Sequence, residues 1–144
     1  LDDAFGRWIQ ELDGRKVVII LDTCHSGGQA THEKGVGVPA AGTAEFDFLD
    51  GELARAKDVG QKETALLTSS KASELSMERR EGDLSVMTYF LTRQLRDGSG
   101  PLTLSQIHGQ LKDSVPLYVE KNFPGATQTP VLADETTPPF YLRP

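Results

Sequence analysis

One cysteine lies where the chain could support nucleophilic chemistry. Cys24 follows the apolar run Val17–Leu21 within the segment Asp22-Thr23-Cys24-His25-Ser26-Gly27-Gly28. The glycines let the backbone approach a ligand closely, and the backbone N–H of Cys24 could stabilise an oxyanion. A free thiol has a pKa of about 8.5, so attack at neutral pH needs a base or a positive field. The alternative is that Cys24 is a small buried apolar residue, as many intracellular cysteines are.

The spacing around Cys24 argues against other familiar chemistries. A cysteine phosphatase loop needs an arginine six positions beyond the thiol, where this chain has Ala30. A nucleophile elbow needs glycine two residues before and two after the nucleophile, where this chain has Asp22 and Ser26. Because Cys24 is the only cysteine, an intrachain disulfide, a CxxC redox pair and a paired-cysteine metal site are excluded.

Composition narrows the class of protein. The chain has 144 residues, 38% of them hydrophobic, which predicts one modest globular unit. Its formal charge of -6 argues against a nucleic-acid partner bound through phosphate neutralisation, whereas basic peptides remain suitable ligands. No apolar run approaches the roughly 20 residues of a membrane helix, and there is no signal-peptide pattern. We expect a cytoplasmic protein with no membrane contact.

The elements that must position Cys24 follow from apolar periodicity. The pattern predicts a short helix first, then a buried strand, a long loop, a second strand, a polar loop, two helices and two short edge strands. In that order they cover Phe5–Leu12, Lys16–Leu21, 26–62, Thr64–Ser69, Ser70–Asp83, Val86–Leu95, Leu104–Val115 with Thr103 as N-cap, Val131–Leu132 and Phe140–Leu142.

This alternation predicts a layered α/β domain with a partly parallel sheet. In such sheets ligands bind beyond the carboxyl ends of the strands, and Cys24 lies in that location. The unbroken apolar character of the first strand suits a parallel sheet that is covered on both faces.

The arrangement strand-Asp-x-Cys-His-Ser-Gly resembles the metacaspase and bacterial orthocaspase branch of the caspase-like peptidases, family C14. Animal caspases carry a Gln-Ala-Cys signature instead. The resemblance continues more weakly in four later segments, so that nearly the whole chain is covered. These segments are Ala65–Ser70, Glu74–Glu78, Met87–Leu91 and Gln128–Leu132.

The resemblance implies a caspase-like three-layer sandwich, in which helices lie on both faces of a mostly parallel central sheet. Residues 1–144 would form a partial peptidase domain that lacks the first strands. Within it, residues 1–31 would hold the nucleophile strand and loop, 32–62 a mobile inter-subunit loop, and 63–144 the small-subunit-like part.

The resemblance also implies peptide-bond hydrolysis by a Cys/His dyad, with Cys24 as nucleophile and its backbone N–H facing the oxyanion. Asp22 corresponds to the floor of the first specificity pocket and implies substrates with Arg or Lys before the scissile bond. Ser69 and Ser70 correspond to substrate-binding positions. The alternative for Asp22 is a strand-end residue that caps local backbone N–H groups.

The catalytic histidine is missing from the expected place. In caspase-like domains it lies about 50 residues upstream of the cysteine, and the 23 residues that precede Cys24 contain no histidine. We expect His25 to be structural, and His32 and His108 to be solvated. The histidine would then lie in an N-terminal part of the domain outside this chain, which begins without methionine as a fragment or processed product would.

This chain alone is therefore expected to be inactive. The remaining alternative is a non-catalytic caspase-like interaction or regulatory module.

Two further expectations concern processing and metals. A basic-specific enzyme could cut its own inter-subunit loop after Arg55, Lys57 or Lys62, although each could equally be an ordinary solvated charge. Residues 28–32 lack the aspartate expected shortly after the cysteine of a calcium-activated metacaspase. We expect no metal site and no cofactor, and calcium activation is doubtful.

Overall fold

A computed structural model describes residues 11–12, 14–22, 64–71, 74–134 and 136–144. The strands are β1 (Val17–Leu21), β2 (Thr64–Thr68), β3 (Leu102–Thr103), β4 (Val131–Asp134) and β5 (Tyr141–Arg143). The helices are α3 (Val86–Asp97) and α4 (Leu104–Asn122). The predicted first helix and the long loop lie outside the described residues, apart from a turn at Glu11 and Leu12.

The main sheet has the strand order β1-β2-β4. β1 and β2 are parallel with Leu21 opposite Thr68, and β2 and β4 are antiparallel. All five residues of β2 are buried, as expected for a central strand, whereas Ile20 of β1 is 40% exposed. The sheet is therefore partly parallel, as predicted, with one pair of each kind among the described strands.

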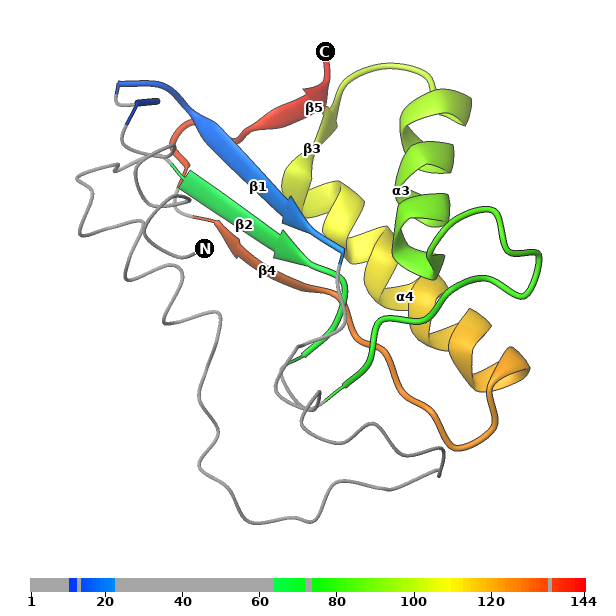
Figure 1. Ribbon diagram of the computed structural model, residues 1–144. Helices are drawn as coiled ribbons and strands as arrows, with labels where there is room; N and C mark the ends of the chain where they lie inside the picture. Colours follow the sequence, from blue (N-terminus) through cyan, green and yellow to red (C-terminus); the bar gives the residue numbers. More distant parts are fainter. Residues whose placement is uncertain (1–10, 13, 23–63, 72–73, 135) are drawn as a thin grey trace, which may run out of the picture.

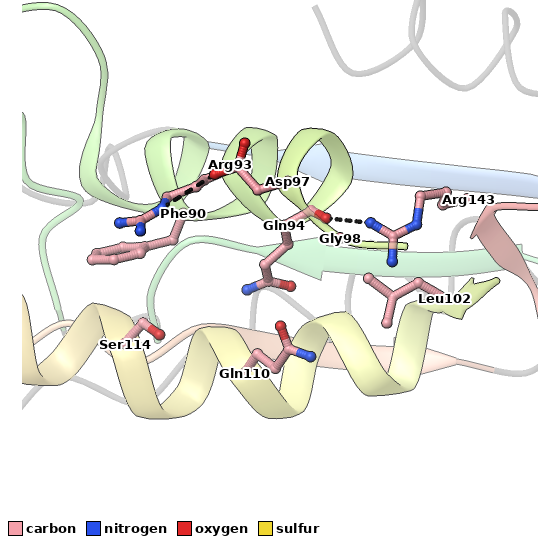
Figure 2. A pocket seen from close by; sticks show the side chains of 9 residues that line it. All are labelled: Phe90, Arg93, Gln94, Asp97, Gly98, Leu102, Gln110, Ser114 and Arg143. Carbon is pink, nitrogen blue, oxygen red and sulfur yellow. Dashed lines mark hydrogen bonds and ion pairs between the residues drawn. The ribbon is translucent and has the colours of Figure 1, made fainter. Parts of the chain in front are cut away.

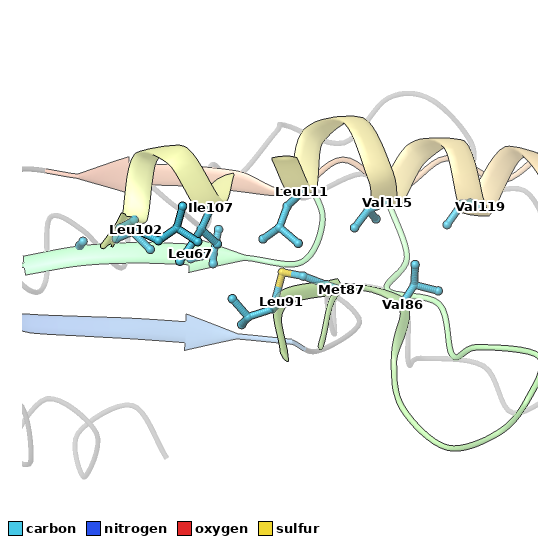
Figure 3. Close-up of a cluster of buried hydrophobic side chains, with 11 residues drawn as sticks. Leu67, Val86, Met87, Leu91, Leu102, Ile107, Leu111, Val115 and Val119 are labelled. Carbon is cyan, nitrogen blue, oxygen red and sulfur yellow. The ribbon is translucent and has the colours of Figure 1, made fainter. Parts of the chain in front are cut away.

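Helices α3 and α4 lie on the same face of the main sheet (Figure 1). The core between them and β2 contains Ala65 and Leu67 from the strand (Figure 3). Burial of one such leucine contributes about 1.5–3 kcal/mol. The helix residues of this core are Val86, Met87, Leu91, Leu104, Ile107, Leu111, Val115 and Val119. Because the described helices cover one face, the three-layer arrangement with helices on both faces stays a prediction.

The start of α4 is capped as the sequence predicted. The Thr103 hydroxyl accepts a hydrogen bond from the Gln106 N–H at 3.2 Å, and the Gln106 side chain accepts one from the Thr103 N–H at 2.9 Å. This capping box satisfies two N–H groups that the helix itself leaves unpaired. The helix runs on to Asn122, seven residues beyond the predicted end at Val115, because Val119 continues the buried face past Pro116.

Both predicted edge strands exist, in different sheets. β4 extends the predicted pair Val131–Leu132 to Asp134 and forms an edge of the described main sheet. β5 pairs antiparallel with β3, a two-residue strand that the sequence did not indicate. The Leu104 N–H donates to the Phe140 carbonyl at 2.8 Å, which attaches this small sheet to the start of α4.

Arg143 of β5 closes the C-terminal end of α3. Its guanidinium donates to the carbonyl of Gln94 at 2.6 Å and to that of Gly100 at 2.7 Å. A cation placed there satisfies carbonyls that the last helical turn leaves unpaired and opposes the negative end of the helix dipole. A Cβ atom added at Gly98 would collide with the guanidinium, although the backbone at Gly98 has an ordinary φ of -85°.

A Gly98→Ala substitution is therefore expected to displace Arg143 and lower the free energy of unfolding by about 1–2 kcal/mol. Gly109→Ala is the matched control, because its Cβ would meet nothing within 4 Å in the middle of α4. It should raise stability by about 0.5–1 kcal/mol through helix propensity. Urea unfolding of both variants measures the difference, and equal stabilities would show that the Arg143 contacts contribute nothing.

Candidate active site

The carboxyl ends of β1 and β2 bring three predicted site residues together. Asp22 follows β1 directly, and Ser69 and Ser70 follow β2. The Ser69 N–H donates to the Leu21 carbonyl at 2.9 Å, which continues the parallel pairing one step beyond the strands. Asp22 and Ser69 are therefore neighbours at the edge of the sheet where an α/β protein binds its ligands.

Several predicted residues lie outside the described residues. They comprise the predicted nucleophile, three basic residues of the loop 32–62, and two histidines. Their roles stay predictions; only the position of Cys24 in the sequence, two residues after Asp22, connects it to the described edge. These residues are Cys24, His25, His32, Arg55, Lys57 and Lys62.

The Asp22 carboxylate accepts hydrogen bonds from the start of α3. Its Oδ2 atom accepts from the Ser85 hydroxyl, from the Thr88 hydroxyl and, at 3.1 Å, from the Thr88 N–H. Ser85 is the N-cap of α3, so a negative charge here also faces the positive end of the helix dipole. Asp22 thus caps a backbone N–H, but one on a helix 66 residues away and not a local one.

The other carboxylate oxygen of Asp22, Oδ1, accepts fewer hydrogen bonds than Oδ2. Oδ1 accepts a hydrogen bond from the Ser76 hydroxyl at 2.8 Å, and within the described part of the chain this is the one bond recorded for it. A carboxylate oxygen can accept two hydrogen bonds. Asp22 therefore combines a structural role at Oδ2 with remaining acceptor capacity at Oδ1.

Ser69 and Ser70 are both buried, at 1% and 8% exposure. The Ser69 hydroxyl is a buried polar atom for which the described residues supply no hydrogen-bond partner. The Ser70 hydroxyl lies 3.5 Å from the Glu74 carbonyl, at the limit of a hydrogen bond. An orphaned buried hydroxyl costs free energy, so the Ser69 position is a place where a partner group would be stabilising.

Gln128, which precedes β4, and Glu74, which follows β2, also reach this edge; the resemblance included their segments but gave these residues no role at the site. Gln128 is fully buried and bonds to the backbone of Ser69 and Met77. Glu74 bonds to Thr129. A usable signal was the position of Gln128 directly before the Thr-Pro pair that leads into an apolar strand. Periodicity cannot predict which loop such a side chain contacts.

We expected His108 to be solvated, but the structure places it against the backbone. Its Nε2 atom lies 3.1 Å from the Pro130 carbonyl and the residue is half-buried, so it joins α4 to the start of β4. The expectation was wrong because it treated the helix face as surface, whereas the chain returns beside it after α4.

The segment that leads into α3 forms a short hairpin, in which Arg79 makes ion pairs with Glu81 and Asp83. The backbones of Glu78 and Ser85 form an antiparallel β-bridge. The Arg79 guanidinium lies 3.6 Å from the centroid of the Tyr89 ring. Burial lowers the pKa of Arg79, but the charges of Asp83 and Glu81 outweigh burial and the pKa is raised. A backbone hydrogen bond, then the Tyr118 hydroxyl, lower the pKa of Glu81, so its contribution to stability is lost as the pH falls through that lowered value.

A pocket of about 370 Å³ lies between α3 and α4 (Figure 2). Its lining includes Gln94, Asp97 and Arg143 at the C-terminal end of α3. Asp22 contacts the N-terminal end of the same helix, so this pocket is separate from the candidate active site.

Neither a metal cluster nor a membrane span is found in the described ranges. These ranges contain no group of three His, Cys, Asp or Glu side chains that could hold a metal ion. Of the helices described, none is long and apolar enough to cross a bilayer.

The comparisons with known proteins identify the family. The family model of the caspase domain, peptidase C14, matches residues 3–141. No curated protein and no solved structure gives a match. The match covers β1, β2 and both helices, and it agrees with the α/β architecture. The chain therefore belongs to the caspase-domain family, peptidase C14, which supports a function of the cysteine-peptidase kind in general terms.

Proposed function

We propose that this domain is a cysteine endopeptidase of the metacaspase or orthocaspase type that cleaves after Arg or Lys. The observation that carries the proposal is the Asp22 carboxylate, held at the carboxyl end of β1 two residues before Cys24, with acceptor capacity left on Oδ1. A guanidinium or ammonium group would complete that acceptor through a charge-assisted hydrogen bond. A substrate without that charge would leave the partly buried carboxylate hydrogen-bonded to its neighbours but without a positive partner, which favours basic substrates.

In the proposed reaction the Cys24 thiol loses its proton to a histidine and attacks the carbonyl carbon of the scissile bond. The carbonyl oxygen takes the electron pair and accepts a hydrogen bond from the Cys24 N–H. As the tetrahedral intermediate collapses, the carbon–nitrogen bond breaks and the histidine protonates the leaving amine. Water then hydrolyses the thioester, releasing the carboxylate product and the thiol.

The exposed side of β1 supports a partner that carries the histidine. Among the described strands β1 pairs only with β2, so no described strand pairs with its other edge, and the run Val17–Leu21 is apolar throughout. An unpaired, apolar strand edge is a template for another strand. We propose that the N-terminal part of the same domain pairs with this edge and brings the histidine to the carboxyl end of β1.

Ser69 and Ser70 are proposed to line the substrate site, with the orphaned Ser69 hydroxyl as its buried side. Self-cleavage after Arg55, Lys57 or Lys62 would follow from the same basic specificity. The proposed enzyme acts in the cytoplasm on protein or peptide substrates and uses no cofactor, and its activation by calcium is doubtful.

The test is covalent labelling of the full-length protein by two peptidyl chloromethyl ketones that differ only in ending with Arg or with Asp. The Arg reagent should alkylate Cys24, with loss of chloride, at least about 100-fold faster than the Asp reagent, because only the former pairs with Asp22. Peptide mass spectrometry locates the adduct. Equal labelling by both reagents would contradict the basic specificity, and no labelling of Cys24 would favour the non-catalytic module.

A further inference from the structure

The chain between β2 and α3 crosses the carboxyl end of the sheet beside Asp22. We call residues 69–71 and 74–77 the β2–α3 loop. Its residue Ser76 donates to Asp22 Oδ1, the oxygen that the proposed function offers to a basic substrate. Figure 1 shows this loop and the segment that leads into β4 at the same end of the sheet. The position of Ser76 therefore affects the geometry of the specificity carboxylate directly.

Gln128 holds the β2–α3 loop at both of its ends. Its Oε1 atom accepts from the Met77 N–H at 2.9 Å, and its Nε2 atom donates to the Ser69 carbonyl at 3.1 Å. The side chain is fully buried, at 0% exposure. A buried amide is costly unless it is hydrogen-bonded, so these two bonds specify one conformation of the loop.

Glu74 makes a second connection from the middle of the loop to the same segment. Its carboxylate accepts from the Thr129 N–H at 2.6 Å and from the Thr129 hydroxyl at 3.0 Å. It also accepts from the Lys71 N–H at 3.3 Å, which holds the loop against itself. Residues 128 and 129, more than 50 positions away in the sequence, thus contact the loop at three places.

We propose that Gln128 and Glu74 are positioning residues for substrate recognition, which hold Ser76 against Asp22 and so set the affinity for a basic side chain. The Met77 N–H that Gln128 binds directly follows Ser76, so loss of this bond lets Ser76 move relative to Oδ1. The inference rests on the proposed function, because it assigns these residues to the specificity site of that enzyme.

A positioning role and a merely structural role predict different kinetics. If the substitution only unfolds some molecules, fewer enzymes are active, so the apparent kcat falls while KM stays the same. If it misplaces the specificity site, the folded enzyme binds a basic substrate more weakly, so KM rises while kcat changes little. The split between KM and kcat therefore separates the two.

The experiment uses Gln128→Met in the full-length protein, with a fluorogenic peptide amide that ends in Arg. Methionine retains the length of the side chain but removes both hydrogen bonds, and KM should rise about tenfold with kcat within about twofold of wild type. Hydrogen exchange of the Met77 amide should accelerate while the amides of α3 and α4 stay protected. Gln110→Met, an exposed residue of α4 at the separate pocket, is the matched control and should change neither.

Glu74→Gln is the milder second variant, since an amide keeps one oxygen acceptor for Thr129. It should raise KM about threefold, and it provides the test of the inference if Gln128→Met fails to fold. An unchanged KM in a folded variant whose loop exchanges faster would overturn the inference and leave the proposed function standing. If the wild-type protein neither cleaves the Arg peptide nor is labelled at Cys24, the proposed function fails and the inference falls with it.

Discussion

Cys24→Ala in the full-length protein is expected to reduce kcat on an Arg peptide amide by roughly 10⁴-fold or more, the size of effect seen when a nucleophile is removed. Alanine cannot form the thioester intermediate, so the remaining rate comes from binding and oxyanion stabilisation alone. The midpoint of thermal unfolding should change little, because a catalytic thiol must be accessible to the substrate and therefore contributes little to core packing.

The alternative role of Cys24 predicts the reverse pattern. A buried structural cysteine would lose packing on substitution by alanine, so the unfolding midpoint would fall while any activity persisted in the folded fraction. Steady-state kinetics and calorimetry on the same preparation measure both quantities. A variant that keeps more than about a tenth of the wild-type kcat would show that another group is the nucleophile.

Asp22→Asn is expected to reduce kcat/KM for an Arg substrate by about 100- to 1,000-fold, since truncation of one partner of a desolvated charge pair costs about 2–5 kcal/mol. The substitution suits the described geometry. The asparagine oxygen can take the place of Oδ2, where three donors meet, and its NH₂ group can donate to the Ser76 hydroxyl in the place of Oδ1. Stability should therefore change little while the charge is lost.

Asp22→Ala is the comparison that separates charge from structure. It removes the acceptor as well, which leaves the hydroxyls of Ser85 and Thr88 without this partner, and it should lower the free energy of unfolding by about 2–3 kcal/mol. The two variants should lose Arg preference equally but differ in stability, as urea unfolding measures. If Asp22→Asn retained full preference for Arg over an uncharged substrate, the carboxylate would be a helix cap and not the specificity residue.

The secondary structure was largely predictable because local patterns determine it. The 3.6-residue spacing of Ile107, Leu111 and Val115 predicted α4, and Thr103 was placed correctly as its N-cap. The β-branched run after Lys16 predicted β1, and its parallel pairing with β2 followed from the alternation of elements. The end of α4 and the strand β3 were missed, because packing beyond Pro116 and pairing with a distant strand are not local properties.

The candidate site was predictable in part for the same reason. The motif around Cys24 named Asp22, and the parallel pairing explains why Ser69 lies beside it. The roles of these residues stay predictions. Gln128 and Glu74 carried little local signal, because a buried hydrogen bond depends on which distant backbone groups come within reach.

The sequence by itself determined which reactive groups are available at Asp22 and Cys24: a carboxylate and a thiol two residues apart after an apolar strand. Only the tertiary structure decided what the carboxylate contacts. Ser76 and Thr88 are 54 and 66 residues from Asp22, and they reach it because the loop before α3 and the N-terminal end of α3 both lie at the carboxyl edge of the sheet. Residue type sets what a group can donate or accept, whereas the packing of helices on a sheet sets which groups come within 3 Å of each other.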